Sequence, residues 1–378
     1  MSTKPRSVEA LTDIFGMRFL VRASLDVPLE GGIAADHFRV RRAIPTFVHL
    51  LDRGARVIIL THVGRDPENS TESLVSLLAK HIPVRYVPAV TGDEVYGAVA
   101  HMKEGTALLL ENLRRDPRET ANDPEFAREL ASYGDFYVND AFAVSHREHA
   151  SIVGIPKFLP SFAGIVFMEE LNELTKVVAP ASPSLFVLGG AKYETKEPLI
   201  EEYSKTYTRT FIGGALANDF LKGKGYEVGT SVVSPVDLTG NELLTRENLK
   251  LPIDVVVEKG GTTRTAAVDE VAKDEKIVDV GLASLEMIEP YIAEAETILW
   301  NGPLGYYEGG FDAATKRCAD LIASSSAYSV VGGGDTVAAI ESMGLQDKFG
   351  FLSTAGGAML EFLEKRTLPG IEALPKES

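Results

Sequence analysis

The sequence predicts an α/β protein of two domains, each built on a parallel β-sheet, with a helix joining them. Short apolar runs alternate with longer amphipathic stretches along the chain, which is typical of βαβ units. The 378 residues are too many for one ordinary core, because domains usually contain about 100 to 200 residues. No low-complexity linker separates the halves, and residues 163 to 180 predict a helix that ends at Pro180.

The expected strands are the apolar runs that end at turn residues. In the first half they cover residues 19 to 25, 56 to 62, 107 to 112 and 136 to 141. In the second half they cover residues 184 to 190, 209 to 214, 254 to 261, 297 to 303, 328 to 335 and 350 to 357. Helical periodicity is clear over residues 123 to 134 and 312 to 325. We place the domain boundary in the joining helix, with domains over residues 1 to 165 and 166 to 362.

Composition excludes several classes of function. The net charge of −16 argues against nucleic acid as a partner, because phosphate backbones are bound by basic surfaces. No apolar segment reaches the roughly 20 residues of a membrane helix, and the N-terminus lacks the apolar run of a secretory signal. We therefore expect a cytoplasmic protein without a membrane partner. The single cysteine, Cys318, excludes an internal disulfide framework.

The two halves differ in the kind of base they carry. Residues 1 to 165 contain 15 Arg and 4 Lys, whereas the remainder contains 5 Arg and 14 Lys. Arginine suits two-pronged recognition of carboxylate or phosphate, whereas lysine acts as a point charge. The first half is therefore expected to hold a small anion with several charges.

Strand after strand of the second half ends in glycine. The glycines are Gly189 and Gly190, Gly213 and Gly214, Gly332 to Gly334, and Gly356 and Gly357. Open parallel sheets bind ligands beyond the carboxyl ends of their strands, and glycine lets backbone N–H groups approach phosphate oxygens there. A tight turn explains any single pair, but four at one sheet edge favour a phosphate site.

Lys192 and Lys196 follow the first of these pairs, one helical turn apart at the expected start of a helix. The macrodipole disfavours positive charge at that position unless an anion binds there, so the pair predicts a polyphosphate site. No G-x-x-x-x-G-K-[ST] or G-x-G-x-x-G sequence is present, which argues against a Walker A protein and a dinucleotide fold. Asp335 follows three glycines and is a candidate ligand for Mg²⁺ or an N-cap of the next helix. Asn301 and Glu308 are candidates for nucleotide contacts.

In the first half, the candidate anion ligands lie at strand ends or on a following helix. They are Arg22, Arg39, His62, Arg65, Arg114, His146 and Arg147. A structural role is the simpler explanation for each of these residues alone. Their shared location is what favours a site for an anion. A guanidinium among them would stabilise the charge on a transferring phosphoryl group.

Several segments in one order resemble the phosphoglycerate kinase family over almost the whole chain. They are VPLEGG (27 to 32), FRVRRAIPT (38 to 46), THVGR (61 to 65), LLLENLR (108 to 114), VNDAFAVSHREHAS (138 to 151), LGGAKYETK (188 to 196), WNGPLGYYE (300 to 308), GGGDT (332 to 336) and STAGGAMLEFLE (353 to 364). The resemblance implies two Rossmann-like three-layer domains joined by a hinge helix. It also implies phosphoryl transfer between ATP and the carboxylate of 3-phosphoglycerate, with Mg²⁺, in a monomer. Residues 363 to 378 are then expected to pack back on the first domain.

The resemblance also implies roles for matching positions. In the N-terminal domain the substrate-binding residues are Ser24, Asp26, Arg39, His62, Arg65, Arg114 and Arg147. In the C-terminal domain the nucleotide-binding residues are Gly190, Lys192, Lys196, Gly213, Gly214, Asn301, Pro303, Glu308, Gly332, Gly333, Gly334, Asp335 and Thr336, with Asp335 also as the metal ligand. Arg39, Lys192 and Lys196 are the predicted catalytic residues.

The chain departs from the family pattern at a few positions. Ser24 and Asp26 stand where the family has the Asp and Asn that contact the acid, and Ala355 and Arg115 replace a glycine and an aromatic residue. A paralog with another acid substrate or reduced activity is therefore one alternative. A second alternative is a non-enzymatic nucleotide-binding protein, but the presence of Lys192, Lys196 and Asp335 argues against it. A third is a nicotinamide-dependent dehydrogenase, but the dinucleotide-binding sequence is missing.

Overall fold

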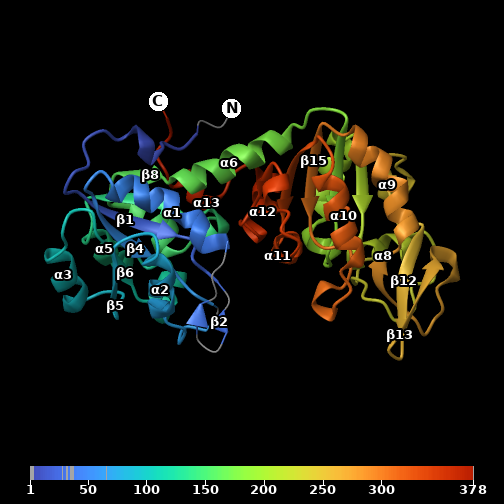
Figure 1. The fold of residues 1–378 in the computed structure, drawn as a ribbon, viewed down its shortest axis with the longest axis horizontal. Helices are drawn as coiled ribbons and strands as arrows, with labels where there is room; N and C mark the ends of the chain where they lie inside the picture. The colour runs from blue at the N-terminus through green and yellow to red at the C-terminus, as the bar shows by residue number, and fades with distance from the viewer. Residues whose placement is uncertain (1–3, 28, 31–32, 35–37, 65, 378) are drawn as a thin grey trace. The chain divides into compact units, whose positions relative to one another are not determined.

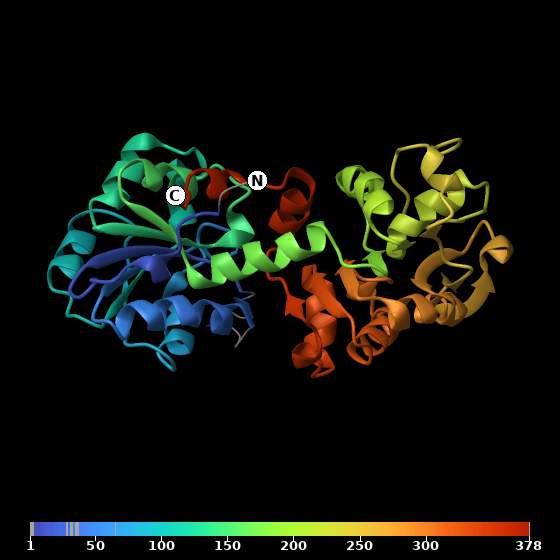
Figure 2. The ribbon, with the colours of Figure 1, turned by 90° about the horizontal axis from the view of Figure 1, so that it is seen from above.

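The computed structural model describes residues 4–27, 29–30, 33–34, 38–64 and 66–377. Contacts within the chain divide it into two compact units. Unit 1 is Met1–Asn172 with Lys365–Ser378, and unit 2 is Glu173–Glu364. The division falls inside helix α6 (Ile165–Val178), the continuous green helix of Figures 1 and 2. The helix predicted between the halves is therefore present, and it ends before Pro180.

Unit 1 is built on a parallel sheet with the strand order β5-β6-β4-β1-β7-β8. Its strands are β1 (Arg18–Ala23), β4 (Arg56–Leu60), β5 (Val84–Val87), β6 (Ala107–Leu110), β7 (Phe136–Asp140) and β8 (Ser161–Ala163), and a hairpin pairs β2 (Leu29–Glu30) with β3 (Ile33–Ala34). Its other helices are α1 (Phe38–Leu51), α2 (Val75–Leu78), α3 (Asp93–Ala100), α4 (Pro117–Thr120), α5 (Pro124–Ala131) and α13 (Pro369–Glu372). Figures 1 and 2 show α1 and α2 on one face of the sheet and α5 on the other.

The core of unit 1 follows from two periodicities. Alternate residues of a strand point to one face, and Phe19 and Val21 of β1 belong to one buried cluster. Helix α1 adds Val40, Ala43, Phe47 and Leu50 to that cluster, at the spacing of three to four residues that defines one helix face. Since β1 pairs parallel with β4 and β7, the carboxyl ends of these strands lie at one edge of the sheet.

Unit 2 contains a second parallel sheet with the order β11-β10-β9-β15-β16-β17. Its strands are β9 (Ser184–Leu188), β10 (Arg209–Ile212), β11 (Leu249–Lys250), β15 (Thr297–Asn301), β16 (Tyr328–Gly332) and β17 (Phe351–Leu352). Its helices are α7 (Glu197–Thr206), α8 (Gly214–Gly223), α9 (Leu282–Glu294), α10 (Ala313–Ala323), α11 (Gly334–Ser342) and α12 (Gly357–Lys365). Helices α9, α10 and α11 cover one face, and α7, α8 and α12 the other (Figures 1 and 2).

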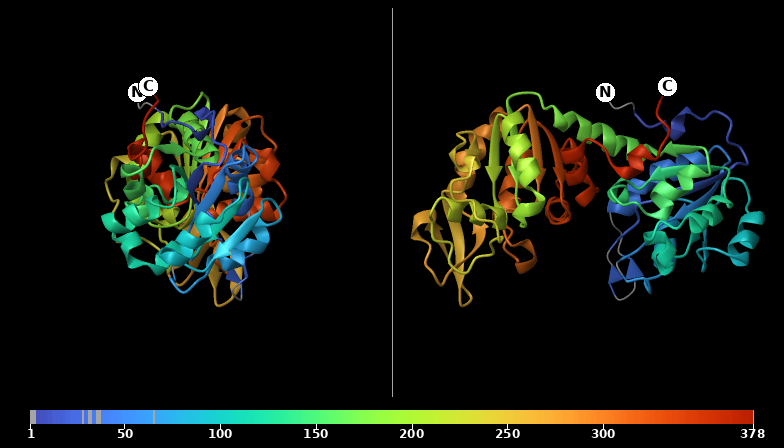
Figure 3. Two further views of the ribbon diagram at one scale, coloured as in Figure 1. Left: turned by 90° about the vertical axis from the view of Figure 1, so that its left-hand side faces the viewer. Right: turned by 180° about the vertical axis from the view of Figure 1, so that it is seen from behind.

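One predicted strand belongs to a different sheet. The run at 254 to 261 was expected in the parallel sheet, but β12 (Asp254–Lys259) pairs antiparallel with β13 (Thr262–Ala267) and β14 (Lys276–Val280). Gly260 and Gly261 both have positive φ, 58° and 83°, and form the two-residue turn between β12 and β13. Glycine pairs favour such tight hairpins, and this explains the antiparallel pairing. The small sheet contacts α8 and α9 (Figure 3).

The predicted gathering of glycines at one sheet edge is confirmed. Strands β9, β10, β16 and β17 run parallel in one sheet, and each is followed by its glycines at the carboxyl end. Most strands end two residues before the predicted position, because most of the glycines lie beyond the last residue of the strand.

The two ends of the chain pair with each other inside unit 1. Pro5 and Lys376 form an antiparallel bridge, and the N–H of Arg6 donates to the carbonyl of Pro375 at 2.9 Å. Helix α13 contacts the segment 150 to 154, and Gly370 donates to the carbonyl of Ser145. Among the described residues, none of the helices combines the length and the apolar character needed to cross a bilayer.

A test of the glycine edge uses Gly189, which directly follows β9. A Cβ at this position would lie 2.2 Å from the carbonyl oxygen of Pro303, which is backbone and cannot turn away. We expect Gly189→Ala to lower the free energy of unfolding by roughly 3 kcal/mol, as overpacking does. Gly334→Ala is the matched control, because nothing lies within 4 Å of its Cβ. Urea unfolding checks both, and equal midpoints for the two variants would contradict the close contact.

Candidate active site

Unit 2 contains a cavity of about 500 Å³ beyond the carboxyl ends of β9, β10 and β15. The strand order reverses at this place, since β10 and β11 extend from one side of β9 and β15, β16 and β17 from the other. Open parallel sheets bind ligands at such a reversal. Strand β14 and residues 303 to 308 complete the wall.

The structure brings some of the predicted nucleotide-binding residues to this cavity. Those that line it are Gly190, Lys192, Gly214, Pro303, Glu308 and Asp335. Those at the same sheet edge but outside the lining are Lys196, Gly213, Asn301, Gly332, Gly333, Gly334 and Thr336. Asn301 ends β15 with its side chain buried, and its Nδ2 lies 3.8 Å from the sulfur of Met359. Its amide therefore faces the interior of unit 2 rather than the cavity.

The two lysines differ in position. Helix α7 begins only at Glu197, so Lys192 and Lys196 precede the helix instead of sharing its first turn as expected. Lys192 is exposed at the cavity with a left-handed backbone (φ 67°). Lys196 is buried, and its Nζ donates to the carbonyl of Gly189 at 2.5 Å. Burial lowers the pKa of Lys196 to about 8.

Backbone contacts explain part of the glycine pattern. The N–H of Gly190 donates to the carbonyl of Pro303 at 2.7 Å, and the N–H of Leu216 to the carbonyl of Gly190 at 2.9 Å. A Cβ at Gly214 would lie 2.6 Å from the nitrogen of Gly190. Close packing between the loops therefore requires glycine at these positions.

The N-termini of α11 and α12 are open by comparison. Nothing lies within 4 Å of a Cβ built on Gly334, Gly356 or Gly357, so the first N–H groups of both helices are not crowded by neighbours. Ala355 is buried, with 1% of its surface exposed, so its methyl group lies inside unit 2.

Asp335 lies in the first turn of α11, exposed at the cavity. The helix is capped by Gly333, so the alternative role of Asp335 as an N-cap is wrong. In the described ranges no group of three or more acidic, His or Cys side chains could hold a metal ion. One carboxylate beside a helix N-terminus fits Mg²⁺ that takes its other ligands from phosphates and water. Among the residues that the structure describes, the buried hydroxyl of Thr336 has no hydrogen-bond partner.

Sequence reasoning missed the cavity wall that comes from the antiparallel sheet. Lys276 of β14 lines the cavity, and its Nζ lies 4.7 Å from the ring centre of Tyr306, another lining residue. Asp279 also lies in this wall, and burial raises its pKa to about 6. These residues do not follow a parallel strand, so the search for polar residues at strand ends passed over them. The Gly260–Gly261 turn was the one available signal.

Unit 1 gathers a basic cluster at the carboxyl edge of its own sheet. The order of this sheet reverses between β1 and β7, and Ser24 and Asp26 follow β1. The Nη1 of Arg39 donates to the carbonyl of Asp26 at 2.8 Å, and Arg114 donates to the carbonyl of Gly64. Residue 65 lies outside the described residues, so the prediction for Arg65 has no structural counterpart here.

The loop after β7 supplies the remaining members of this cluster. The Nε of Arg147 lies 3.3 Å from Nε2 of His146. Burial, together with the charges of Arg22, Arg147 and Arg114, lowers the pKa of the neighbouring His149 to about 4. The charge effects show that these arginines share one region of unit 1.

His62 and Asp26 form a defined pair inside the cluster. Arginine only donates, so the 2.9 Å contact from Nη2 of Arg22 makes Nδ1 of His62 an acceptor and places the proton on Nε2. That N–H faces Oδ2 of Asp26 at 3.5 Å. Burial lowers the pKa of His62 to about 4 despite Asp26, so the contact is a long hydrogen bond from a neutral ring rather than an ion pair.

Asp26 is held as a carboxylate. Burial raises its pKa, but the hydrogen bonds from His62 and from the N–H of Gly64, at 2.7 Å, outweigh burial and bring the pKa to about 2. The charge of Arg39 acts in the same direction. A carboxylate in an anion-binding region is therefore accommodated by neighbouring donors.

Arg22 differs from the other candidate ligands because it is buried. Its Nε donates to Oγ of Ser151 at 3.0 Å and its Nη1 to the carbonyl of Ala23 at 2.6 Å, while Nη2 contacts His62. All three nitrogens are used inside the protein, so Arg22 is a structural cation.

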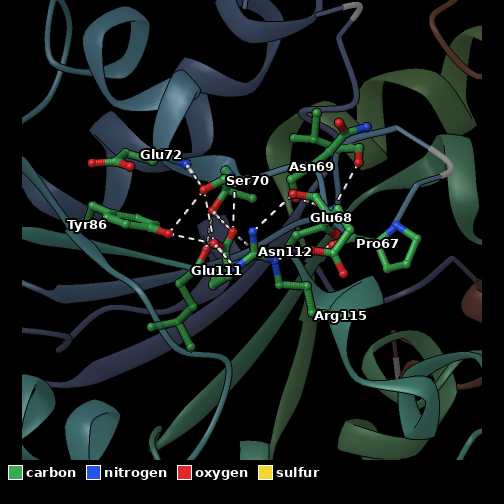
Figure 4. Close-up of polar contacts among 12 residues, drawn as sticks. Pro67, Glu68, Asn69, Ser70, Glu72, Tyr86, Glu111, Asn112 and Arg115 are labelled. Atoms are coloured by element: carbon green, nitrogen blue, oxygen red, sulfur yellow. Dashed lines mark hydrogen bonds and ion pairs between the residues drawn. The ribbon is translucent and has the colours of Figure 1, made fainter. Parts of the chain in front are cut away.

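A further network holds the loop that follows β4 (Figure 4). Glu111, directly after β6, accepts hydrogen bonds from the N–H of Thr71 and the hydroxyls of Ser70 and Tyr86. Arg115 lies 2.8 Å from Glu111 and donates to the carbonyl of Glu68 at 3.1 Å. Arg115, which replaces an aromatic residue of the family pattern, thus connects Glu111 to this loop.

Comparison with known proteins identifies the family. The family model described as phosphoglycerate kinase matches residues 9–366. The chain belongs to the phosphoglycerate kinase family. The phosphoglycerate kinase of Rubrobacter xylanophilus is 42% identical with 98% of both sequences covered, and that of Dictyoglomus turgidum is 39% identical with 96% of both covered.

Solved phosphoglycerate kinase structures share the fold. The enzyme from Coxiella burnetii superposes with a TM-score of 0.83 at 33% identity, and that from Pyrococcus horikoshii OT3 with a TM-score of 0.86 at 28% identity, each covering 98% of both chains. The predicted family, fold class and enzyme class are therefore confirmed. These comparisons give no support to a paralog of altered substrate.

Asp26→Asn tests the pairing in the basic cluster. In this variant the amide oxygen accepts from the N–H of Gly64, and the amide NH₂ group then faces the N–H of His62. Two donors therefore face each other. We expect the free energy of unfolding at neutral pH to fall by roughly 1 kcal/mol, a value discounted for the partial exposure of Asp26. Urea unfolding of unit 1, followed beside the exposed-residue control Asp13→Asn, measures it.

The pH dependence of this difference has a definite sign. The pKa of Asp26 is about 2 in the folded chain and ordinarily 3.8, so ionised Asp26 stabilises the folded state above about pH 4. This contribution is lost as pH falls toward 2. The gap between Asp26→Asn and the unmodified chain should therefore narrow in acid, and a constant gap would contradict the assignment.

Proposed function

We propose that the chain transfers a phosphoryl group reversibly between ATP and the carboxylate of 3-phosphoglycerate, forming ADP and 1,3-bisphosphoglycerate. The nucleotide binds in the cavity of unit 2 and the acid binds at the basic cluster of unit 1. The observation that carries this assignment is the position of Lys192, Glu308 and Asp335 around one cavity at the strand reversal of a sheet in a phosphoglycerate kinase family member.

In unit 2, the exposed ammonium of Lys192 contacts the nucleotide phosphates, and Glu308 accepts from the ribose hydroxyls. Lys196 adds a buried positive charge beside Gly190. The open N-termini of α11 and α12 offer backbone N–H groups to phosphate oxygens. Phosphoryl transfer depends on positioning and on neutralisation of charge at the equatorial oxygens, and these groups supply both.

Asp335 would hold Mg²⁺ together with the phosphates of the nucleotide, and the ion would neutralise phosphate charge. The exposed single carboxylate and the unpartnered Thr336 hydroxyl support this role.

In unit 1, the phosphate and carboxylate of the acid bind to Arg39, Arg114 and Arg147, with Arg65 added by the family resemblance. Ser24 and Asp26 contact the hydroxyl group of the acid. The carboxylate oxygen of the acid attacks the γ-phosphorus, an O–P bond forms, and the bond to the ADP oxygen breaks. Since a carboxylate is an adequate nucleophile, no covalent enzyme intermediate is required, and Arg39 stabilises the moving group.

Transfer requires the acid and the nucleotide to meet. We place the hinge for this movement in α6, because the division between the units falls within that helix. Closure would exclude the water that hydrolyses an acyl phosphate. One chain carries both sets of residues, so a monomer suffices, and a cytoplasmic location suits an enzyme that uses ATP.

Lys192→Ala tests the nucleotide half of the proposal. Loss of the exposed ammonium should lower kcat by about 100- to 1,000-fold, because a preorganised charge on the moving group is removed. A coupled assay with 3-phosphoglycerate, ATP and Mg²⁺ measures the rate. The control is Lys205→Ala, an exposed lysine on α7, which should leave the rate unchanged. An unaltered rate in Lys192→Ala would remove this residue from the mechanism.

The same assay tests the whole function. Tight ATP binding without turnover of any glyceric acid phosphate would overturn the proposed reaction and leave an altered paralog or a non-enzymatic protein.

Binding of the nucleotide should also take up a proton in alkaline solution. Burial lowers the pKa of Lys196 to about 8, so the free enzyme loses this charge as pH rises through that value. Nearby phosphates favour the charged form, so binding near pH 9 should be accompanied by uptake of about one proton, and affinity should fall as pH rises. Calorimetry in two buffers of different ionisation enthalpy measures the uptake. Lys196→Met should abolish it and Lys205→Met should not, and buffer-independent heats in the unmodified chain would contradict it.

A further inference from the structure

We propose that Glu119, which lies outside the acid-binding cluster, is a positioning residue that fixes His62 through Ser151 and Arg22. The inference rests on the proposed function only in taking His62 as part of the acid site. Every link between these four residues is a direct hydrogen bond with a defined direction.

The first link joins Glu119 to Ser151. Glu119 belongs to the short helix α4 and has 1% of its surface exposed. Its Oε2 accepts from the N–H of Ser151 at 2.9 Å, and its Oε1 accepts from the hydroxyl of Ser151 at 2.5 Å. Both carboxylate oxygens therefore point at one residue, which they hold by its backbone and its side chain.

The second link joins Ser151 to Arg22. A serine hydroxyl has one hydrogen, and here Glu119 receives it. The lone pairs of the oxygen are left to accept from Nε of Arg22 at 3.0 Å. The hydroxyl thus connects a buried carboxylate with a buried guanidinium, each of which would be costly in the interior without the other.

The third link joins Arg22 to His62. With Nε on Ser151 and Nη1 on the carbonyl of Ala23, the plane of the guanidinium is fixed and Nη2 is directed at Nδ1 of His62. The ring must then carry its proton on Nε2, toward Asp26. Arg22 is a cation that lies between two carboxylates. Ser151 separates it from Glu119, and His62 separates it from Asp26.

Other charged and titratable groups surround this chain. His149 approaches Glu119, with Nδ1 to Oε1 at 3.8 Å, and the hydroxyl of Tyr137 donates to the carbonyl of Ser151 at 2.6 Å. Arg114 adds positive charge near His62 and Glu119. None of these interposes in the links from Glu119 to His62, and so the geometry points to Glu119 as the anchor.

The test is the titration of His62 by ¹⁵N NMR in Glu119→Gln, without substrate. Removing a negative charge lowers the pKa of a nearby histidine if the effect is only electrostatic. Release of Arg22 does the opposite, because it frees Nδ1 to take a proton. We expect the pKa of His62 to rise from about 4 toward its ordinary 6.5 and both tautomers to appear. An unchanged or lowered pKa would overturn the proposal.

Two further variants make the result decisive. Ser151→Ala removes only the bridging hydroxyl and should also raise the pKa of His62, so it decides the question if Glu119→Gln does not fold. Glu125→Gln changes an exposed acid of the neighbouring helix α5 and should leave the titration unaltered.

The kinetic effect should fall on one substrate. In Glu119→Gln and Ser151→Ala, KM for 3-phosphoglycerate should rise about tenfold while KM for ATP stays constant. A raised pKa of His62 with no change in KM for the acid would overturn the role of His62 in binding but not the link to Glu119. The titration and the assay therefore separate this inference from the proposed function.

Discussion

The contact between the loops that follow β9 and β15 fixes the cavity of unit 2. Gly189 donates to the carbonyl of Asn301 at 2.9 Å and Gly190 to that of Pro303 at 2.7 Å, so the two loops lie backbone against backbone. The carbonyl of Gly189 accepts a hydrogen bond from Nζ of Lys196. The carbonyl of Gly190 accepts one from the N–H of Leu216, in the first turn of α8. A side chain at Gly189 or Gly302 would meet the backbone of the opposite loop and separate the two loops. The position of the lysines, the start of α8 and the cavity wall at Pro303 all depend on it.

Unit 1 handles charge in another way. Arg39, Arg114 and Arg147 are half-buried near its sheet edge, while Arg22 is buried in the interior, where it contacts Ser151 and His62. Burial and, to a smaller extent, the charge of Arg22 lower the pKa of His62, and Nη2 of Arg22 contacts its Nδ1. Asp26 keeps its negative charge through donors from His62 and Gly64, and this explains how a carboxylate stands at the edge of an anion site.

Much of this architecture could be predicted from the sequence. The alternation of apolar runs gave the parallel sheets, and the glycine-ended strands indicated the edge at which ligands bind, because both depend on local pattern. The antiparallel pairing of β12 could have been recognised from Gly260 and Gly261, but the wall formed by Lys276 and Asp279 depends on how that small sheet packs on α8. No local pattern encodes that packing.

The state of individual side chains was also beyond the sequence. Lys192 and Lys196 are the same residue type four positions apart, yet one is exposed and the other is buried on a carbonyl. Arg22 and Arg39 both looked like anion ligands, and only the structure shows that Ser151, Ala23 and His62 occupy every nitrogen of Arg22. One of these partners, Ser151, lies 129 positions from Arg22 in the chain, so no local pattern around Arg22 indicates the contact.

The order of the chain through the two units affects how the protein is made. Unit 1 needs residues from both ends, since Lys365–Ser378 joins Met1–Asn172, whereas unit 2 is one continuous stretch. Helix α13 rests against Ser145, next to the loop that bears His146 and Arg147. During synthesis from the N-terminus, unit 2 therefore has all of its residues before unit 1 does. The loop that bears His146 and Arg147 therefore gains the contact with α13 only after unit 2 has been synthesised.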